Sequence, residues 1–204
     1  MLAFHNDTKI KEKYLSRVIS HYNADEIEKG FYWENGKGCA VGCTIHGSNH
    51  EDYETELGIP RILARLEDGI FENLPNGTAK KWPKEFLEAI NVGADLSGIW
   101  PKFAVWLLTD KKYGVLQYAK TDKQKIAIKN VAELYTKHKT VSREEWNKAR
   151  GDVYDASEAT YDSDAASAYA SDVAAAAAAA YDTYKYKHMM AQASKLIRLL
   201  KACK

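Results

Sequence analysis

Two cysteines and two histidines lie close together in the stretch CAVGCTIHGSNHED, residues 39–52. They are Cys39, Cys43, His46 and His50. Thiolates and imidazoles are common zinc ligands in proteins, and a cysteine beside a histidine can also act as nucleophile and base. This stretch is therefore the first place in the chain where we expect chemistry.

The spacing of these four residues limits what they can do together. Successive members are four, three and four positions apart, so on one continuous helix all four side chains follow one stripe. Cys39 and His50 then stand about 16 Å apart along the axis, whereas zinc needs each ligand within about 2.0 to 2.3 Å. A four-ligand zinc site requires the chain to fold back, which Gly42 and Gly47 permit.

Two interpretations of the cysteines stay open. In the first, Cys39 and Cys43 are small buried apolar side chains, and the protein needs no metal or cofactor. In the second, the stretch is the centre of a zinc-dependent or cysteine-based enzyme, with zinc as the cofactor. Neither the H-E-x-x-H pattern of zinc proteases nor the H-x-E and P-C-x-x-C patterns of cytidine deaminases occurs. The sequence therefore favours a protein that is not an enzyme.

The glycines of ENGKGCAVGC give a third interpretation. If Cys39 begins a helical turn, the backbone N–H groups beside Lys37 form an electropositive nest for a phosphate or carboxylate. The pattern is not a nucleotide-binding P-loop, because no G-K-[ST] follows. The predicted ligand-binding residues are Lys37, Cys39, Cys43, His46, His50, Arg61 and Arg65. The alternative for the two arginines is surface ion pairing with Glu56, Glu67 or Asp68.

Charge and composition exclude several classes of partner. The 29 basic residues nearly balance the 28 acidic residues, so no global field favours nucleic acid or an anionic membrane surface. The longest apolar run, residues 173–181, is too short and too rich in alanine to span a bilayer. An odd number of cysteines and an N-terminus without a secretory signal predict a reducing cytoplasm.

Helical periodicity, proline positions and capping boxes predict an all-α fold, a multi-helix bundle. The boxes pair Ser48 with Glu51, Thr121 with Gln124, and Ser142 with Glu145. The expected helices are about Thr8–Tyr22, Asn49–Leu57, Pro60–Leu74, one after each of Pro83 and Pro101, Thr121–Lys137, and one that starts after Ser142. We expect residues 1–140 to form a helical core domain that carries the Cys/His/Gly-rich segment.

Residues 141–204 have a different composition, rich in alanine, tyrosine and aspartate, with the near repeat YDASEAT and YDSDAAS. Alanine has the highest helix propensity, so we expect a long C-terminal helix or a helical hairpin that breaks near Gly151, Ser163 or Ser171. Alanine faces let helices approach closely. We therefore expect this segment to pack on the core or on another subunit, which makes a homo-oligomer.

The segments GKGCAVGCTIHGSNHEDYETELGIPRILARLEDGIFENLP and WPKEFLEAINVGADLSGIWPKFAVWLL, with the repeat-rich tail, resemble a group of phage and prophage proteins that has no assigned activity. The resemblance implies a small accessory protein that works in a bacterial host cytoplasm. From this setting we expect a counter-defence binding protein, which sequesters an anionic nucleotide-type signal or blocks a host defence protein. The alternatives are the enzyme described above and a purely structural helical oligomer.

Overall fold

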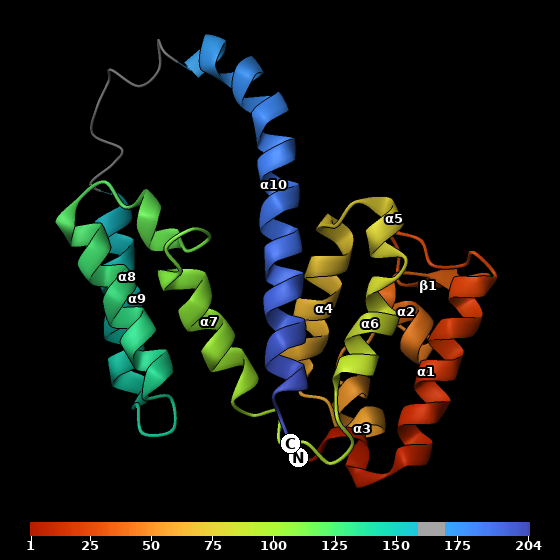
Figure 1. The fold of residues 1–204 in the computed structure, drawn as a ribbon. Helices are drawn as coiled ribbons and strands as arrows, with labels where there is room; N and C mark the ends of the chain where they lie inside the picture. Colours follow the sequence, from red (N-terminus) through yellow and green to blue (C-terminus); the bar gives the residue numbers. More distant parts are fainter. Residues whose placement is uncertain (159–169) are drawn as a thin grey trace. The chain divides into compact units, whose positions relative to one another are not determined.

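The computed structural model describes residues 1–158 and 170–204 and confirms an all-α fold (Figure 1). Its one described sheet is a short antiparallel hairpin, β1 (Trp33–Glu34) with β2 (Lys37–Gly38). The helices are α1 (Thr8–Asn23), α2 (Ala40–Ile45), α3 (Asp52–Leu57), α4 (Arg61–Asn73), α5 (Asn76–Ala79), α6 (Trp82–Ala89), α7 (Ile99–Thr109), α8 (Asp122–Thr136), α9 (Arg143–Glu158) and α10 (Ala170–Lys201). The described residues also form two 3-10 turns, η1 (Ala3–Asn6) and η2 (Val115–Tyr118).

The chain forms two compact units. Residues 1–100 and 185–204 make the first unit, and residues 101–184 make the second. The expected boundary at residue 140 instead falls between α8 and α9, which pack against each other. A short connection between helices makes them antiparallel neighbours, so these two helices form one hairpin of the second unit.

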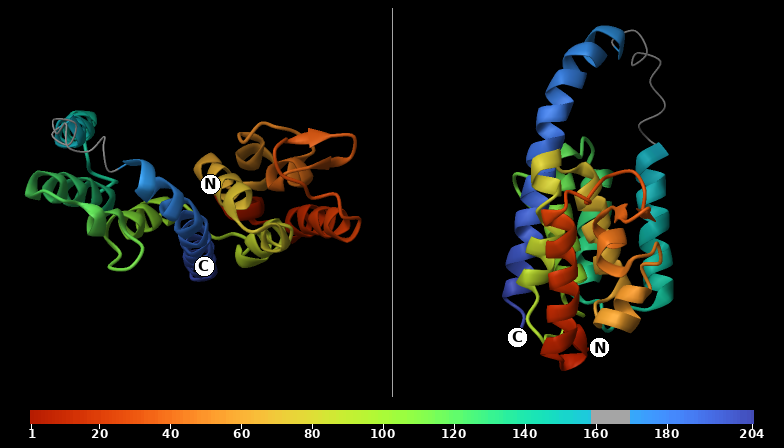
Figure 2. Two further views of the ribbon diagram at one scale, coloured as in Figure 1. Left: turned by 90° about the horizontal axis from the view of Figure 1, so that it is seen from above. Right: turned by 90° about the vertical axis from the view of Figure 1, so that its right-hand side faces the viewer.

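The core of the first unit is built around large aromatic side chains. Tyr14, Tyr53 and Trp82 are among its fully buried residues. The last turns of α10 complete this unit, because its Leu196 and Leu200 are buried and Asn91 Nδ2 donates to the carbonyl of Cys203 at 2.6 Å. The two chain termini consequently lie at the same end of the unit (Figures 1 and 2).

Two of the three predicted capping boxes form. The Thr121 and Gln124 side chains cap α8 reciprocally, and Ser142 and Glu145 do the same for α9. The box predicted at Ser48 was wrong, because α3 begins three residues later than expected, at Asp52, and has no side-chain cap bond. The side chain of Asn49 instead accepts from the Glu51 N–H at 3.1 Å and holds a turn ahead of the helix.

The predicted breaks in the alanine-rich segment have different outcomes. Gly151 lies within α9, which continues to Glu158, and Ser171 lies within α10. Ser163 lies outside the described residues.

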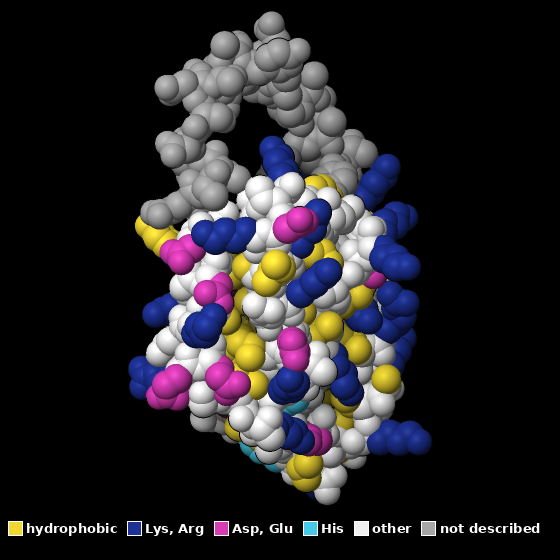
Figure 3. Space-filling view, turned by 90° about the vertical axis from the view of Figure 1, so that its left-hand side faces the viewer, with side chains coloured by type: hydrophobic (Ala, Val, Ile, Leu, Met, Phe, Trp, Pro, Cys, Tyr) yellow, Lys and Arg dark blue, Asp and Glu magenta, His cyan; other side chains and the backbone are white. Residues whose placement is uncertain are grey.

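Within the second unit, η2, α8 and α9 border an apolar hollow of about 280 Å³. Figure 3 shows lysines and arginines spread among acidic and hydrophobic side chains on one face of the molecule. No helix among the described residues has the length and hydrophobicity to cross a membrane.

Candidate metal centre

The segment that precedes α2 packs directly on its N-terminus, and two glycines make this possible. A Cβ atom at Gly38 would lie 1.8 Å from the carbonyl oxygen of Tyr32, and one at Gly42 would lie 1.5 Å from the same oxygen. The Cys39 N–H donates to the carbonyls of Phe31 and Tyr32 at 3.0 and 3.1 Å. These glycines therefore serve close backbone packing.

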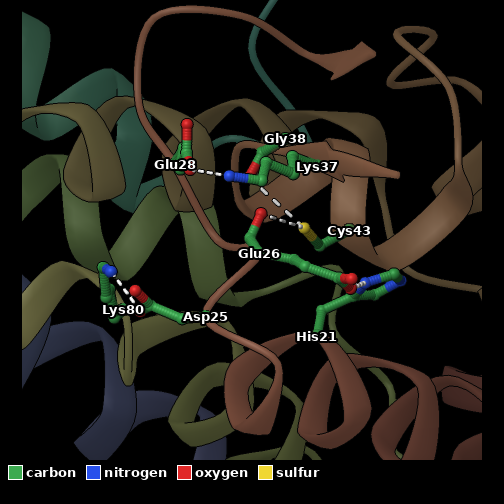
Figure 4. A network of polar contacts seen from close by, with 8 residues as sticks. All are labelled: His21, Asp25, Glu26, Glu28, Lys37, Gly38, Cys43 and Lys80. Atoms are coloured by element: carbon green, nitrogen blue, oxygen red, sulfur yellow. Dashed lines mark hydrogen bonds and ion pairs between the residues drawn. The ribbon is translucent and has the colours of Figure 1, made fainter. Parts of the chain in front are cut away.

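The backbone groups of the expected anion nest are bonded within the protein. Gly38 N donates to the Glu26 carbonyl at 3.1 Å, and Gly42 N donates to the Sγ atom of Cys39 at 3.5 Å. The ammonium of Lys37 lies 2.7 Å from a carboxylate oxygen of Glu28 (Figure 4). The structure thus uses the predicted N–H donors and the lysine for internal contacts.

The two arginines that were predicted to serve the site lie apart from these donors. Arg61 pairs with Glu51 at the surface, rather than with any of the three acidic residues proposed from the sequence. Arg65 is exposed on α4. Neither arginine is among the residues that line the pocket beside Cys39.

The structure does not bring the four Cys and His residues together at one point. Cys43 is buried, and its thiol donates to the carbonyls of Gly38 and Glu26 at 3.3 and 3.7 Å (Figure 4). His46 ends α2 in a left-handed conformation, with φ 55°, and its Nε2 lies 2.8 Å from Nε2 of His21. A zinc site with all four residues is therefore not the arrangement that the fold produces.

Cys39 and His50 both meet residues of α4 that the sequence did not single out. Cys39 lines a pocket of about 230 Å³, together with Gly30, Phe31, Tyr32, Asp68 and Glu72. The Sγ atom of Cys39 and one carboxylate oxygen each of Asp68 and Glu72 all lie within 4.8 Å of one another. His50 also contacts this cluster, because its Nε2 lies 3.4 Å from Oδ2 of Asp68.

Asp68 is an incompletely bonded carboxylate. Its side chain is only 17% exposed, and Oδ1 is enclosed without a hydrogen-bond donor among the described residues. No lysine or arginine lines the pocket, and the ammonium of Lys29, which feels the charge of Glu72, donates instead to the carbonyl of Leu74. His50 contacts the other oxygen, Oδ2, and Tyr32 also hydrogen-bonds to Asp68. An enclosed carboxylate oxygen without a donor is nevertheless costly unless a cation or proton compensates it.

The thiol of Cys39 is neutral in this environment. Burial raises the pKa of Cys39 to about 12, and the negative charge of Asp68 acts in the same direction. Burial likewise raises the pKa of the Cys43 thiol to about 12. A thiol with such a pKa is a poor nucleophile near neutral pH, but a bound metal ion would favour its thiolate.

A second buried carboxylate lies next to Asp68 in sequence. Glu67 is fully buried, and its Oε2 accepts from the hydroxyl of Tyr53 at 2.7 Å. Burial raises the pKa of Glu67 to about 8, with a further contribution from the charge of Asp68. Glu67 is therefore a core residue whose raised pKa favours its neutral form.

Reasoning from the sequence missed Asp68 and Glu72. The available signal was their i, i+4 spacing on α4, which places two carboxylates on one face. That spacing is common on solvated helix faces, and only the packing of α2 against α4 brings Cys39 to the pair.

Comparison of the chain with models of protein families, with curated proteins and with solved structures finds no match.

Proposed function

We propose that the protein binds a divalent transition-metal ion in this pocket, with Cys39, Asp68 and Glu72 as ligands. The observation that carries the proposal is the convergence of three ligand atoms within 4.8 Å of one another. One of the three residues, Asp68, also has an enclosed oxygen that meets no donor in the described part of the chain. A bound cation supplies the charge that these groups need.

The chemistry of the three ligands favours zinc. Ligand atoms on one tetrahedral zinc lie about 3.4 to 3.6 Å apart, so small side-chain rotations close the cluster onto an ion. Magnesium and calcium take oxygen ligands almost exclusively, whereas a thiolate with carboxylates suits zinc. The contact from His50 to Asp68 Oδ2 fits the outer-shell hydrogen bonds that orient ligating carboxylates.

With three protein ligands, a four-coordinate zinc ion would keep one position for another group. Structural zinc sites use four protein ligands, while catalytic sites keep a position for water or substrate. A free position on the ion favours the zinc-dependent enzyme over the cysteine-based enzyme. In that enzyme Asp68 and Glu72 would be ligands where the sequence suggested Cys43 and His46. Metal analysis of protein purified without chelator, together with zinc titration of the chelator-treated protein, tests the proposal. A zinc content below about a tenth of an equivalent and no rise in melting temperature on adding zinc would refute it.

The phage setting and the counter-defence role remain predictions. A bound divalent ion would reverse the sign of the acidic pocket, so an anionic nucleotide-type ligand is compatible with this site only when metal is present. A thermal-shift panel of nucleotides with and without zinc tests this. Sizing of the full chain tests the predicted homo-oligomer, because truncation before α10 would also remove buried residues of the first unit.

A further inference from the structure

Three aromatic rings join the last turn of α1, the C-terminus of α2 and the hairpin of β1 and β2. His21 and His46 face each other, with 2.8 Å between their Nε2 atoms and ring planes 78° apart. The indole of Trp33 stacks on His46, with centroids 4.2 Å apart and planes within 15°. It also meets the ring of His21, at 5.2 Å between centroids. The two histidines therefore hold the hairpin against the ends of both helices.

A single hydrogen accounts for the contact between the two Nε2 atoms. Two ring nitrogens 2.8 Å apart form a hydrogen bond only when one carries a hydrogen and the other a lone pair. His21 Nδ1 lies 2.6 Å from Glu26 Oε2 (Figure 4). The neutral ring of His21 consequently donates from Nδ1 to this carboxylate, and its Nε2 accepts from the Nε2–H of His46.

The pair can take up one proton without losing its bond. A proton on His21 lies beside the carboxylate of Glu26, and His21 then donates from both nitrogens while His46 accepts at Nε2 and keeps its hydrogen on Nδ1. A second proton gives each ring a positive charge and an N–H that points at the other ring. The hydrogen bond is then lost and the two rings repel each other.

We propose that His21 and His46 form an acid-sensitive latch, which keeps the hairpin closed until both rings carry a proton and then frees Trp33 from the end of α1. Part of His46 is exposed, so protons from solvent reach it. The two residues before Trp33 line the pocket beside Cys39, and the latch therefore also holds one wall of that pocket.

The surroundings of His46 favour its neutral form while the latch is closed. Burial, followed by the charges of Arg17 and His21, lowers the pKa of His46 below its ordinary value of 6.5. Arg17 is held close to the end of α2, because its Nη1 donates to the carbonyl of Thr44 at 2.8 Å. Opening the latch takes His46 away from these groups, so the open form binds a proton more readily than the closed form.

This difference sets the direction of the pH dependence. The form that binds more protons gains as the pH falls, so the closed latch loses stability below pH 6.5 and keeps it above. Two further titratable groups beside these rings have other partners. Glu26 bonds to His21, and His50 contacts the ring of Tyr32, at 5.6 Å between centroids.

The solvent exposure of Trp33 provides the readout. Acrylamide quenching of fluorescence is measured from pH 7.5 to pH 5.0 in chelator-treated protein, for the wild type and for Trp33→Phe. The difference between the two reports Trp33 alone. We expect its quenching constant to rise about twofold or more on acidification, with a midpoint below pH 6.5, while the far-UV circular dichroism stays constant.

Two variants should remove this acid step. His46→Asn has no titrating ring and suits the left-handed backbone at this position, where φ is 55°. His21→Gln leaves an amide oxygen that accepts from either form of His46, so no charge repulsion develops. Each variant is compared with its own Trp33→Phe counterpart and should show the same quenching of Trp33 at both ends of the pH range. His138→Gln, in the second unit, is the matched control and should keep the acid step.

Three results would overturn the proposal. They are an acid step that persists in His46→Asn, a midpoint at or above pH 6.5, and a loss of helical circular dichroism that accompanies the exposure of Trp33. The last result would mean that acid unfolds the whole first unit rather than freeing the hairpin. Because the experiment uses metal-free protein, its outcome is independent of the zinc proposal.

Discussion

The Sγ atom of Cys39, at the N-terminus of α2, lies within 4.8 Å of a carboxylate oxygen of Asp68, on α4. Burial, and then the negative charge of Asp68, raise the pKa of the thiol and keep it protonated, while Oδ1 of Asp68 has no hydrogen-bond donor among the described residues. A divalent cation between them resolves both problems, because it stabilises the thiolate and the carboxylate together.

Removal of either carboxylate should therefore weaken zinc binding. We expect Asp68→Asn and Glu72→Gln each to raise the dissociation constant for zinc by at least tenfold, measured by competition with a chromophoric chelator. Glu51→Gln is the matched control, because Glu51 is an exposed partner of Arg61. Equal zinc affinity in all three variants would contradict the assigned ligands.

The thiols should differ in reactivity. In chelator-treated protein at pH 8, a pKa near 12 leaves Cys39 and Cys43 almost entirely protonated, while Cys203 is partly exposed. Titration with a disulfide reagent should modify one thiol rapidly in the native protein and three in guanidinium chloride. Rapid reaction of three thiols in the native protein would show that α2 is not packed as described.

Glu67 should make the protein less stable as the pH rises. Between its ordinary pKa of 4.5 and its raised pKa of about 8, the folded state keeps a proton that the unfolded state has lost. The free energy of unfolding then falls by about 1.4 kcal/mol for each pH unit in this window. Glu67→Gln, which has no proton to lose, should gain stability relative to the wild type from pH 5 to pH 8. Urea unfolding with chelator present measures this, and parallel pH profiles would argue against a neutral Glu67.

The glycines of the hairpin contact should tolerate no side chain. Gly42→Ala places a methyl group on the carbonyl of Tyr32, so we expect a loss of about 3 kcal/mol or more in unfolding free energy. Gly69→Ala on α4 meets no atom within 4 Å and should stabilise the protein by up to about 1 kcal/mol. Thermal unfolding of both variants compares them directly, and similar melting temperatures would contradict the close contact.

The capping boxes at Ser142 and Ser48 should differ in their effect on stability, because only the first forms in the structure. Ser142→Ala removes a side-chain bond to the Glu145 N–H and should cost about 1 kcal/mol, as N-cap substitutions do. Ser48→Ala should have almost no effect, although the same sequence pattern predicts a box there. Chemical denaturation measures the unfolding free energy of both variants. An equal loss of unfolding free energy in Ser142→Ala and Ser48→Ala would count against this interpretation.

Local signals in the sequence predicted most of the helices. Periodicity, prolines and the boxes at Thr121 and Ser142 act within a few residues, and they located α1, α4, α8 and the start of α9 closely. The Ser48 box failed because the turn at Asn49 uses a neighbouring side chain with the same chemistry.

The candidate site was harder to predict, since it depends on contacts distant in sequence. The sequence pointed to Cys39 and His50, but their partner Asp68 comes from another helix. The two thiols also have different partners, because Cys43 donates to the Gly38 carbonyl whereas Cys39 accepts from the Gly42 N–H. The glycines were interpreted as ligand-facing, whereas they accommodate the carbonyl of Tyr32. Only the tertiary packing of the hairpin on α2 distinguishes these two roles.

The first unit is discontinuous in sequence, with residues 185–204 returning to residues 1–100. During synthesis Leu196 and Leu200 must therefore leave the ribosome before the first unit can bury its last core side chains, whereas residues 101–184 leave it earlier. The nascent first unit waits, incomplete, for the final helix, and in that interval its exposed apolar surface is open to chaperones.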